Sequence, residues 1–264
     1  MAMKFCSISS GSKGNCYLLK IDEYIVLVDA GISGKKIFEG LKHNGINPDE
    51  VDAILVTHEH SDHVKGIKMV CKKSSKAKIY ANIDTWEKIK MEDFEDRHIE
   101  IEANNEFNIG KAIIKPFSVH HDAVDPLGYT FSYGERKLSI LTDTGHICES
   151  IYNNIYDSTL LVIESNHEVN LLRMCSYPYE VKRRILGDYG HLSNEMAAKC
   201  ISAIITEESP CETVLLAHLS KENNTPQLAK LTIMNHIEDC ELSENNNINI
   251  EVITQNDISD VYIV

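Results

Sequence analysis

"ILVTHEHSDHVKG" (residues 54–66) places three histidines and two acids within six positions, directly after a short apolar run. His58 and His60 are two residues apart, so in an extended chain both side chains point to the same side. A helix cap just after them turns the chain and brings Asp62 and His63 to a second position nearby. This segment can therefore begin two metal sites about 3.5–4 Å apart. A solvated histidine-rich loop is the plain alternative. The zincin motif H-E-x-x-H is not formed, because Asp62 stands where its second histidine belongs.

Further metal-binding residue types follow apolar runs elsewhere in the chain. "PFSVHHDAVDP" (116–126) supplies His120 and His121, "ILTDTGH" (140–146) supplies Asp143, and "LLAHLS" (215–220) supplies His218. Each follows a predicted strand, where side chains project from the sheet edge. Any one of them alone could be a capping or structural residue. Their occurrence together, in this order, favours a metal centre.

Composition places the chain among ordinary globular proteins. It has 264 residues, 43% of them hydrophobic and 25% charged, and a net charge of −14. An acidic balance argues against a basic protein that coats nucleic acid, yet a local field at a site can oppose the global charge. No apolar run approaches the roughly 20 residues of a membrane span, and the first 15 residues lack the apolar core of a signal peptide. Eight cysteines without a C-x-x-C pair indicate free thiols, so we expect a cytoplasmic protein. The oligomeric state cannot be read from the sequence.

The order of predicted elements indicates an α/β sandwich with sites at strand ends. The sequence contains no repeat or linker, so residues 1–264 are expected to form a single domain. Strands are predicted at 24–31, 52–58, 77–81, 111–119, 127–134, 136–145, 158–165, 212–220 and 247–253. Helices are predicted at 33–45, with Ser33 as N-cap and Gly45 as stop, and at 63–74, 84–91, 167–187, 193–205 and 225–237.

These motifs resemble the metallo-β-lactamase superfamily. Its signature H-x-H-x-D-H is matched by His58, His60, Asp62 and His63, and Asp29 in "LVDAG" matches the acid that orients the metal-binding loop. The resemblance implies an αββα four-layer sandwich. It also implies two metal sites that share Asp143. The first would consist of His58, His60 and His121, and the second of Asp62, His63 and His218.

Within that superfamily the chain is similar to the YycJ-like (WalJ-like) branch over nearly its whole length. The similarity is most specific at "VTHEHSDH", "HDAVDPLGY", "IESNHE", "YPYEVKRRILGDYGHLSNE" and "AHLSKENN". The "HDA" motif selects His121 as a ligand and leaves His120 on the opposite face of its strand. Members of this branch are described as metal-dependent exonucleases that act on DNA in the 5′→3′ direction. DNA is therefore the expected partner, with two divalent ions as cofactors: zinc or manganese, and iron as a third option.

A further histidine favours phosphate ester chemistry. His191 in "YGHLSNE" is not needed for the metal set, and related ribonucleases pair a similar histidine with an acid, here Glu164 in "LVIES". Such a pair can donate a proton to the leaving oxygen. The alternative is that His191 only caps the helix that follows. Asn166 and His167 are expected to support the site from behind.

Two stretches are candidates for substrate contact. The Gly/Ser loop "SSGSKGN" (9–15), with Ser10 and Asn15, could approach an anion through its backbone amides, although short turns look the same. Arg183 and Arg184 in "KRR" could contact phosphates. A solvated helix face explains these arginines equally well.

Two divalent ions with two ionised aspartates leave a local charge of about +2 in an acidic protein, which suits a phosphodiester. A metal-bridging hydroxide would attack phosphorus in line, with Asp62 holding the water. The alternatives are an ester, thioester or lactone hydrolase or a β-lactamase on the same scaffold, an RNA-processing nuclease, and a non-catalytic binding module. A flavodiiron oxidoreductase is disfavoured, because its motif has Glu where His60 stands.

Overall fold

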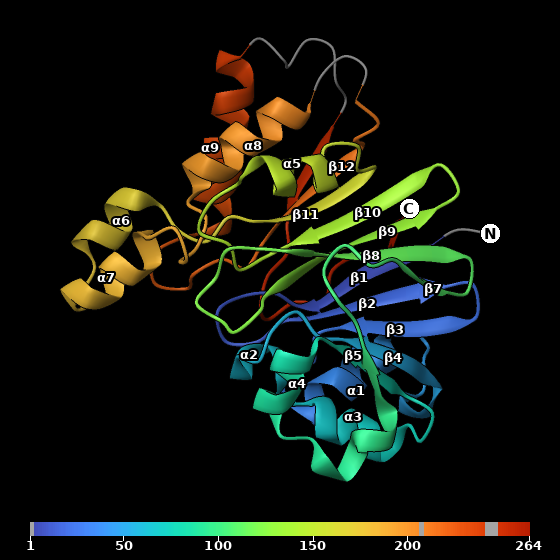
Figure 1. Cartoon of the computed structure of the whole chain (residues 1–264). Coiled ribbons are helices and arrows are strands. Elements are labelled where there is room, and N and C mark those ends of the chain that lie inside the picture. Colours follow the sequence, from blue (N-terminus) through green and yellow to red (C-terminus); the bar gives the residue numbers. More distant parts are fainter. Residues whose placement is uncertain (1–2, 206–208, 241–247) are drawn as a thin grey trace.

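Two seven-stranded β-sheets pack face to face, and helices cover the outer face of each (Figure 1). The computed structural model describes residues 3–205, 209–240 and 248–264. This is the αββα four-layer arrangement that the sequence predicts, so the fold prediction is confirmed. Among the described residues, every helix is too short or too polar to span a membrane.

The first sheet comes mainly from the N-terminal part of the chain, and its strand order is β14-β1-β2-β3-β4-β5-β6. The last strand, β14, returns from the C-terminus to pair with β1. The strands are β1 (Lys4–Ser9), β2 (Cys16–Ile21), β3 (Tyr24–Val28), β4 (Val51–Leu55), β5 (Lys78–Ala81), β6 (His98–Glu100) and β14 (Tyr262–Ile263). The helices of this half are α1 (Gly34–His43), α2 (Ser61–Val64), α3 (Ile67–Lys73) and α4 (Ile83–Ile89), with 3₁₀ turns η1 (Pro48–Glu50) and η2 (Glu92–Arg97).

The second sheet has the order β13-β12-β11-β10-β9-β8-β7. Its strands are β7 (Phe107–Ile109), β8 (Ala112–Ser118), β9 (Leu127–Tyr133), β10 (Arg136–Leu141), β11 (Leu160–Glu164), β12 (Thr213–Ala217) and β13 (Asn249–Val252). The helices of this half are α5 (Glu149–Ile155), α6 (Val169–Met174), α7 (Tyr179–Leu186), α8 (Asn194–Ile204) and α9 (Pro226–Asp239). Helices α6 and α7 lie away from α5, α8 and α9, at the left of Figure 1.

Both sheets are antiparallel in one half and parallel in the other. The parallel strands are β3 to β6 in the first sheet and β10 to β13 in the second. Five predicted site residues lie at or just beyond the carboxyl ends of these parallel strands: Asp29, His58, Asp143, Glu164 and His218. Parallel strands therefore deliver side chains from both sheets to one edge of the sandwich.

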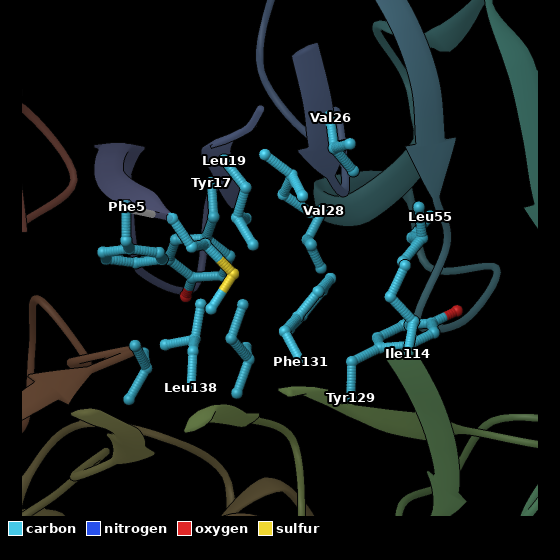
Figure 2. Packing of buried hydrophobic residues seen from close by; sticks show 14 of the residues in the cluster. Phe5, Tyr17, Leu19, Val26, Val28, Leu55, Ile114, Tyr129, Phe131 and Leu138 are labelled. Carbon is cyan, nitrogen blue, oxygen red and sulfur yellow. The ribbon is translucent and has the colours of Figure 1, made fainter. Parts of the chain in front are cut away.

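The core between the sheets explains why both sheets are required. Strand β3 sends Val26 and Val28 into the space between the sheets, and Ile25 and Leu27 toward the helices outside. Aromatic side chains fill the centre of this space, among them Phe5, Tyr17, Tyr129 and Phe131 (Figure 2). Strands buried on both faces read as continuous apolar runs, which is the pattern of the strands predicted at 24–31 and 52–58.

Helix boundaries agree with the sequence where caps are present and differ where the chain turns. Ser33 caps α1 as predicted, accepting a hydrogen bond from the Lys36 amide at 3.3 Å. The expected helix over 63–74 is broken between α2 and α3. At the break the Gly66 amide donates a hydrogen bond of 2.8 Å to the Ala30 carbonyl, outside the helix. The expected helix over 167–187 is two helices, because α7 starts anew after Pro178, which has no amide to continue α6. Position 247 of the last predicted strand lies outside the described residues.

Candidate active site

A cleft of about 600 Å³ opens where the parallel strands of both sheets end. This is the usual position of a ligand site in an open α/β sheet. Predicted site residues from both halves of the chain line the cleft: His60, Asp62, His121, Asp143, His191 and His218. Lys13 and Lys221 also line it. Neither lysine was singled out in the sequence, although they lie in the quoted motifs "SSGSKGN" and "AHLSKENN".

The first cluster consists of His58, His60 and His121. One nitrogen of each ring lies within 4.8 Å of the others. The His58 and His60 rings meet edge to face at 4.6 Å, and each has its centroid 5.1 Å from that of His121. His121 donates from Nδ1 to the Gly190 carbonyl at 3.1 Å, which leaves Nε2 to face the cluster. Three imidazoles in this arrangement suit a transition metal.

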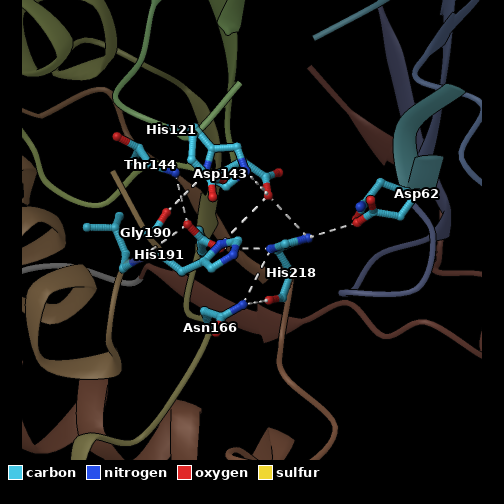
Figure 3. A network of polar contacts seen from close by, with 12 residues as sticks. Asp62, His121, Asp143, Thr144, Asn166, Gly190, His191 and His218 are labelled. Atoms are coloured by element: carbon cyan, nitrogen blue, oxygen red, sulfur yellow. Dashed lines mark hydrogen bonds and ion pairs between the residues drawn. The ribbon is translucent and has the colours of Figure 1, made fainter. Parts of the chain in front are cut away.

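The second cluster consists of Asp62, His63 and His218, again with ligand atoms within 4.8 Å of one another. His63 donates from Nδ1 to Asp29 at 2.7 Å, and its Nε2 is 3.6 Å from Asp62. His218 lies across the cleft, with Nε2 4.0 Å from Asp62 (Figure 3). The turn into α2 therefore presents Asp62 and His63 at a second position, as the sequence spacing predicts.

Asp143 lies between the two clusters. Its carboxylate is 3.4 Å from His63 Nε2, 3.5 Å from His218 Nε2 and 3.8 Å from His121 Nε2. It is buried, and the positive charge that the surrounding histidines can carry outweighs burial and lowers its pKa. An ionised carboxylate in this position can bind cations on either side.

Three buried atoms in these clusters have no hydrogen-bond partner among the described residues: His58 Nε2, His218 Nε2 and Asp143 Oδ2. Buried polar atoms are almost always paired, so orphaned atoms need an explanation. Here all three belong to clusters of nitrogen and oxygen donors, the ligand set of a divalent transition metal. The residues present therefore fit divalent metal ions.

Asp29 links the two clusters from behind. It accepts hydrogen bonds from the Thr57 amide and hydroxyl, each at 2.9 Å, and from His63. Because the Thr57 hydroxyl donates to Asp29, it accepts from His58 Nδ1 at 3.0 Å. One buried carboxylate thus fixes the ring orientation of a histidine in each cluster. The sequence predicts the role of Asp29 but not that of Thr57.

Three site residues adopt left-handed backbone conformations, with φ of 58° at Asp29, 58° at Asp143 and 55° at His218. Such a conformation costs a side-chain-bearing residue about 1–2 kcal/mol. Strain of this kind collects at functional sites, where the surrounding structure enforces it. At each of these three residues the left-handed conformation turns the chain sharply where the chain leaves a parallel strand.

His120 and His121 have different environments. The structure places His121 in the first cluster, whereas His120 turns away and stacks on His146 with ring centroids 4.1 Å apart. His120 Nε2 also lies 3.4 Å from Cys148 Sγ. This is the arrangement that the "HDA" motif indicates.

Glu164 holds two histidines at once. Its Oε1 accepts from His191 Nδ1 at 2.8 Å and from His218 Nδ1 at 2.7 Å, while Oε2 accepts from the amides of Thr144 and Leu192. Burial would raise the pKa of this carboxyl, but His191 and His218 outweigh it and hold the pKa below its ordinary value. The pair of Glu164 with His191 is present as the sequence suggests. The contact with His218 was not foreseen.

Asn166 and His167 lie beside this network. Asn166 donates from Nδ2 to the His218 carbonyl at 2.9 Å and so supports the loop that carries His218. His167 is buried, its ring nitrogens have no hydrogen-bond partner among the described residues, and burial lowers its pKa to about 4. A neutral His167 therefore packs behind the site and does not line the cleft.

Ser10 and Asn15 are buried beneath the site. Ser10 accepts from the His218 amide at 2.9 Å, and Asn15 contacts His63 Nε2 through its side-chain amide at 3.1 Å. Asn15 also holds the metal-motif loop (residues 58–63) in place, since its backbone amide donates a hydrogen bond of 2.8 Å to the Asp62 carbonyl. The structure therefore gives these residues positioning contacts and places neither side chain on the cleft surface.

Arg183 and Arg184 face different ways. Arg184 lines the cleft and is paired with Asp122, which adjoins His121. Arg183 is outside the cleft, exposed, and 3.2 Å from Glu180. Only Arg184 is in a position to meet a substrate in the cleft.

Comparison with known proteins agrees with this geometry. The family model described as "Beta-lactamase superfamily domain" matches residues 24–218, which is most of the chain and includes both clusters. The chain belongs to the metallo-β-lactamase superfamily. This membership identifies it as a metal-dependent hydrolase.

Relatives within the superfamily are similar over almost their whole length. The chain is 38% identical to exodeoxyribonuclease YycJ of Bacillus anthracis over 244 residues, which cover 90% of both proteins. It is also 38% identical to exodeoxyribonuclease WalJ of Streptococcus pneumoniae serotype 2, over 92% of this chain and 91% of that one. The similarity to the YycJ-like branch is thus confirmed.

Solved structures share the fold at low sequence identity. YhfI from Bacillus subtilis superimposes with a TM-score of 0.71 at 16% identity and full coverage of both chains. The short form of human tRNase Z gives 0.65 at 15% identity, with 97% of this chain and 98% of that one covered. These likenesses establish the fold alone.

Proposed function

We propose that this metallo-β-lactamase superfamily protein is a DNA exonuclease that degrades strands in the 5′→3′ direction. The observation that carries the proposal is the pair of metal-competent clusters beside the Glu164–His191 pair, all facing one cleft. The names of relatives at 38% identity support DNA as the substrate. The polarity follows the branch that the sequence resembles.

Two divalent ions, zinc or manganese with iron as a third option, would be held at this site. His58, His60 and His121 would bind one ion, and Asp62, His63 and His218 the other, with Asp143 contacting both. When bound, such ions supply a hydroxide nucleophile near neutral pH and neutralise charge that develops on phosphate. The donor atoms fit this role because each cluster combines buried, oriented groups with an opening to the cleft.

The protein's own groups complete the reaction. Asp62 is partly exposed, so its carboxylate can hold a water for attack on phosphorus by a hydrogen bond. His191 is fixed through Nδ1 by Glu164, which leaves Nε2 to donate a proton to the leaving oxygen. Arg184 at the rim can contact a neighbouring phosphate.

We further propose that residues 1–264 act as one domain in a reducing, cytoplasmic compartment. Neither sheet carries a complete site, since the first supplies His58 and the second supplies Asp143 and His218. All eight cysteines are free thiols in the structure, and Cys240 is exposed. Free exposed thiols persist in reducing compartments.

The two clusters are expected to bind metal with different pH dependence. Burial lowers the pKa of His58 and His121, so these two ligands of the first cluster are held in the neutral form that binds metal. Burial also opposes charge on His63, but Asp29 and Asp143 outweigh it and raise its pKa to about 10; the pKa of His218 is raised as well. A metal ion must displace these protons from the second cluster.

Calorimetric titration of zinc into metal-free protein, in buffers of different ionisation enthalpy, measures the protons released. We expect one binding event with little proton release and a second that releases about two protons and tightens as pH rises from 6 to 9. Two events with equal proton release would contradict the assignment of different charge to the two clusters.

Nuclease assays on end-labelled single- and double-stranded DNA and RNA test the activity itself. Metal-stripped protein would be assayed with zinc or manganese added back, and an Asp62→Asn/His63→Ala double variant controls for contaminating nucleases. We expect stepwise shortening of DNA that requires metal and loses at least about 10³-fold in the variant. A label at either end gives the polarity.

Other outcomes favour the alternatives. Preferential cutting of RNA would indicate an RNA-processing nuclease. Turnover of a thioester or lactone, with no polymer cut, would indicate a small-molecule hydrolase on the same scaffold. Fewer than one metal ion per chain would indicate a non-catalytic binding module.

A further inference from the structure

Helices α6 and α7 form a hairpin, residues 169–186, that lies apart from the other helices (Figure 1). No residue of α7 is buried, so this helix contributes little to the core. The hairpin is held together by Lys182, whose ammonium donates to the carbonyls of Arg173 at 2.7 Å and Cys175 at 2.6 Å. Leu172 anchors α6 in the core, whereas α7 is fixed but unburied and is available to bind another molecule.

The surface of this hairpin is unusual for the chain. It has four cations and one acid, a net charge of +3 in a protein of −14. It also exposes large apolar side chains: Met174 is 84% exposed and Tyr179 74%, with Leu171 and Leu186 also exposed. Positive charge beside an exposed aromatic ring is the combination that binds single-stranded nucleic acid.

Helix α7 separates two hollows. Val181, Arg184 and Ile185 on one side line the active-site cleft. On the other side a second hollow of about 590 Å³ is lined by Arg173, Tyr179, Lys182, Arg183, Leu186 and Gly187. A strand that leaves the cleft over α7 would therefore reach the second hollow directly.

We propose that this second hollow binds single-stranded nucleic acid several nucleotides away from the bond that is cut. This inference rests on the proposed nuclease function and adds a separate binding site to it. A base would stack on Tyr179, and the guanidinium of Arg173 would contact phosphate. Charge complementarity selects the occupant, because a polyanion is attracted to the basic hairpin and repelled by most of the acidic protein.

The geometry makes the effect depend on strand length. A helix with its side chains is about 10–12 Å across, and successive phosphates of one strand are about 3.4 Å apart along the axis of a duplex. A strand with duplex-like spacing would therefore extend about three nucleotides beyond the cleft to reach Tyr179. A dinucleotide cannot reach it.

A Tyr179→Ala/Arg173→Ala variant tests the proposal in the metal-loaded protein. Binding of a hydrolysis-resistant phosphorothioate (dT)20 strand is followed by fluorescence anisotropy, and cleavage of the dinucleotide dTpdT is followed in parallel. We expect Kd for the 20-nucleotide strand to rise about tenfold. The slope of log Kd against log salt concentration should fall by about one, the value for one lost phosphate contact. We expect kcat/KM for dTpdT to stay as in the parent.

A matched control removes an exposed tyrosine and an exposed cation elsewhere. Tyr156 is 50% exposed at the end of α5, and Lys35 is exposed on α1; neither lines either hollow. The Tyr156→Ala/Lys35→Ala variant should bind (dT)20 like the parent. Equal weakening in the two variants would overturn the proposal, because it would show a general effect of lost surface charge.

Further outcomes separate this inference from the proposed function. If the parent cuts DNA and the Tyr179→Ala/Arg173→Ala variant binds (dT)20 unchanged, the hairpin site is refuted and the nuclease stands. If the parent cuts no nucleic acid but loses (dT)20 binding in the variant, the nuclease is refuted and the hairpin site stands. If light scattering shows a parental dimer that the substitutions dissociate without changing Kd, the hairpin is an interface between copies and the proposal fails.

Discussion

Gly31→Ala is expected to abolish activity although Gly31 carries no side chain and contacts no substrate. A β-carbon at this position would lie 1.5 Å from the Asp62 carbonyl oxygen and 2.6 Å from the His63 amide nitrogen. The metal-motif loop cannot move aside cheaply, because Asn15 and Ala30 each donate a backbone hydrogen bond of 2.8 Å to it. The substitution must displace Asp62 and His63 by more than 1 Å.

The expected loss is at least 100-fold in kcat/KM, because misplacement of a site by about 1 Å costs that much. The free energy of unfolding should fall by about 3 kcal/mol, the upper end for overpacking. Urea denaturation and metal analysis check these effects. The variant should retain the first metal ion, at His58, His60 and His121, and lose the second.

Gly134→Ala is the matched control. Gly134 has a left-handed φ of 64° in the β9–β10 turn, and an added β-carbon would meet nothing within 4 Å. It should lose about 1 kcal/mol of stability through backbone strain alone and keep full activity. If Gly31→Ala behaves like Gly134→Ala, close packing of the two backbones is not what positions Asp62.

The sequence predicts those parts of the site that depend on local geometry. After β4 the chain is first extended and then turns into a helix, and the H-x-H-x-D-H spacing follows this change. His58 could therefore be assigned to the first cluster, and Asp62 and His63 to the second, before the fold was known. Asp143 and His218 could be found because each follows an apolar strand. Strand pattern and strand ends are visible in a sequence.

Contacts between distant segments could not be predicted in this way. Ser10 and His218 are 208 residues apart, and only the packed sheets bring the Ser10 hydroxyl to the His218 amide. The Gly/Ser loop alone predicts substrate contact for Ser10, because its buried partner cannot be seen in the sequence. The structure places Ser10 beneath the site. Gly190 and Thr57 were missed for the same reason, since a backbone carbonyl and a hydroxyl acquire their roles only through a partner from another element.

Glu164→Gln is expected to damage metal binding and proton donation together. Glu164 is buried and accepts four hydrogen bonds, including those from His191 and His218. Glutamine keeps the shape of the side chain. However, its amide nitrogen cannot accept a hydrogen bond, so the donors to one of the two oxygens would lose their partner, and the negative charge beside both imidazoles is removed. We expect about 3 kcal/mol lower stability, 10- to 100-fold weaker binding of the second ion, and a lower kcat.

His191→Ala separates the two roles of Glu164. His191 lines the cleft, so water can replace its hydrogen bond to Glu164, and His218 keeps its own bond of 2.7 Å to the same oxygen. This variant should therefore bind both ions like the parent, while kcat falls 10²- to 10⁴-fold through loss of the proton donor. Competition with a chromophoric chelator measures metal affinity, and cleavage of dTpdT measures kcat. If Glu164→Gln leaves metal affinity unchanged and matches His191→Ala in kcat, then Glu164 acts only through His191 and its contact with His218 does not position a metal ligand.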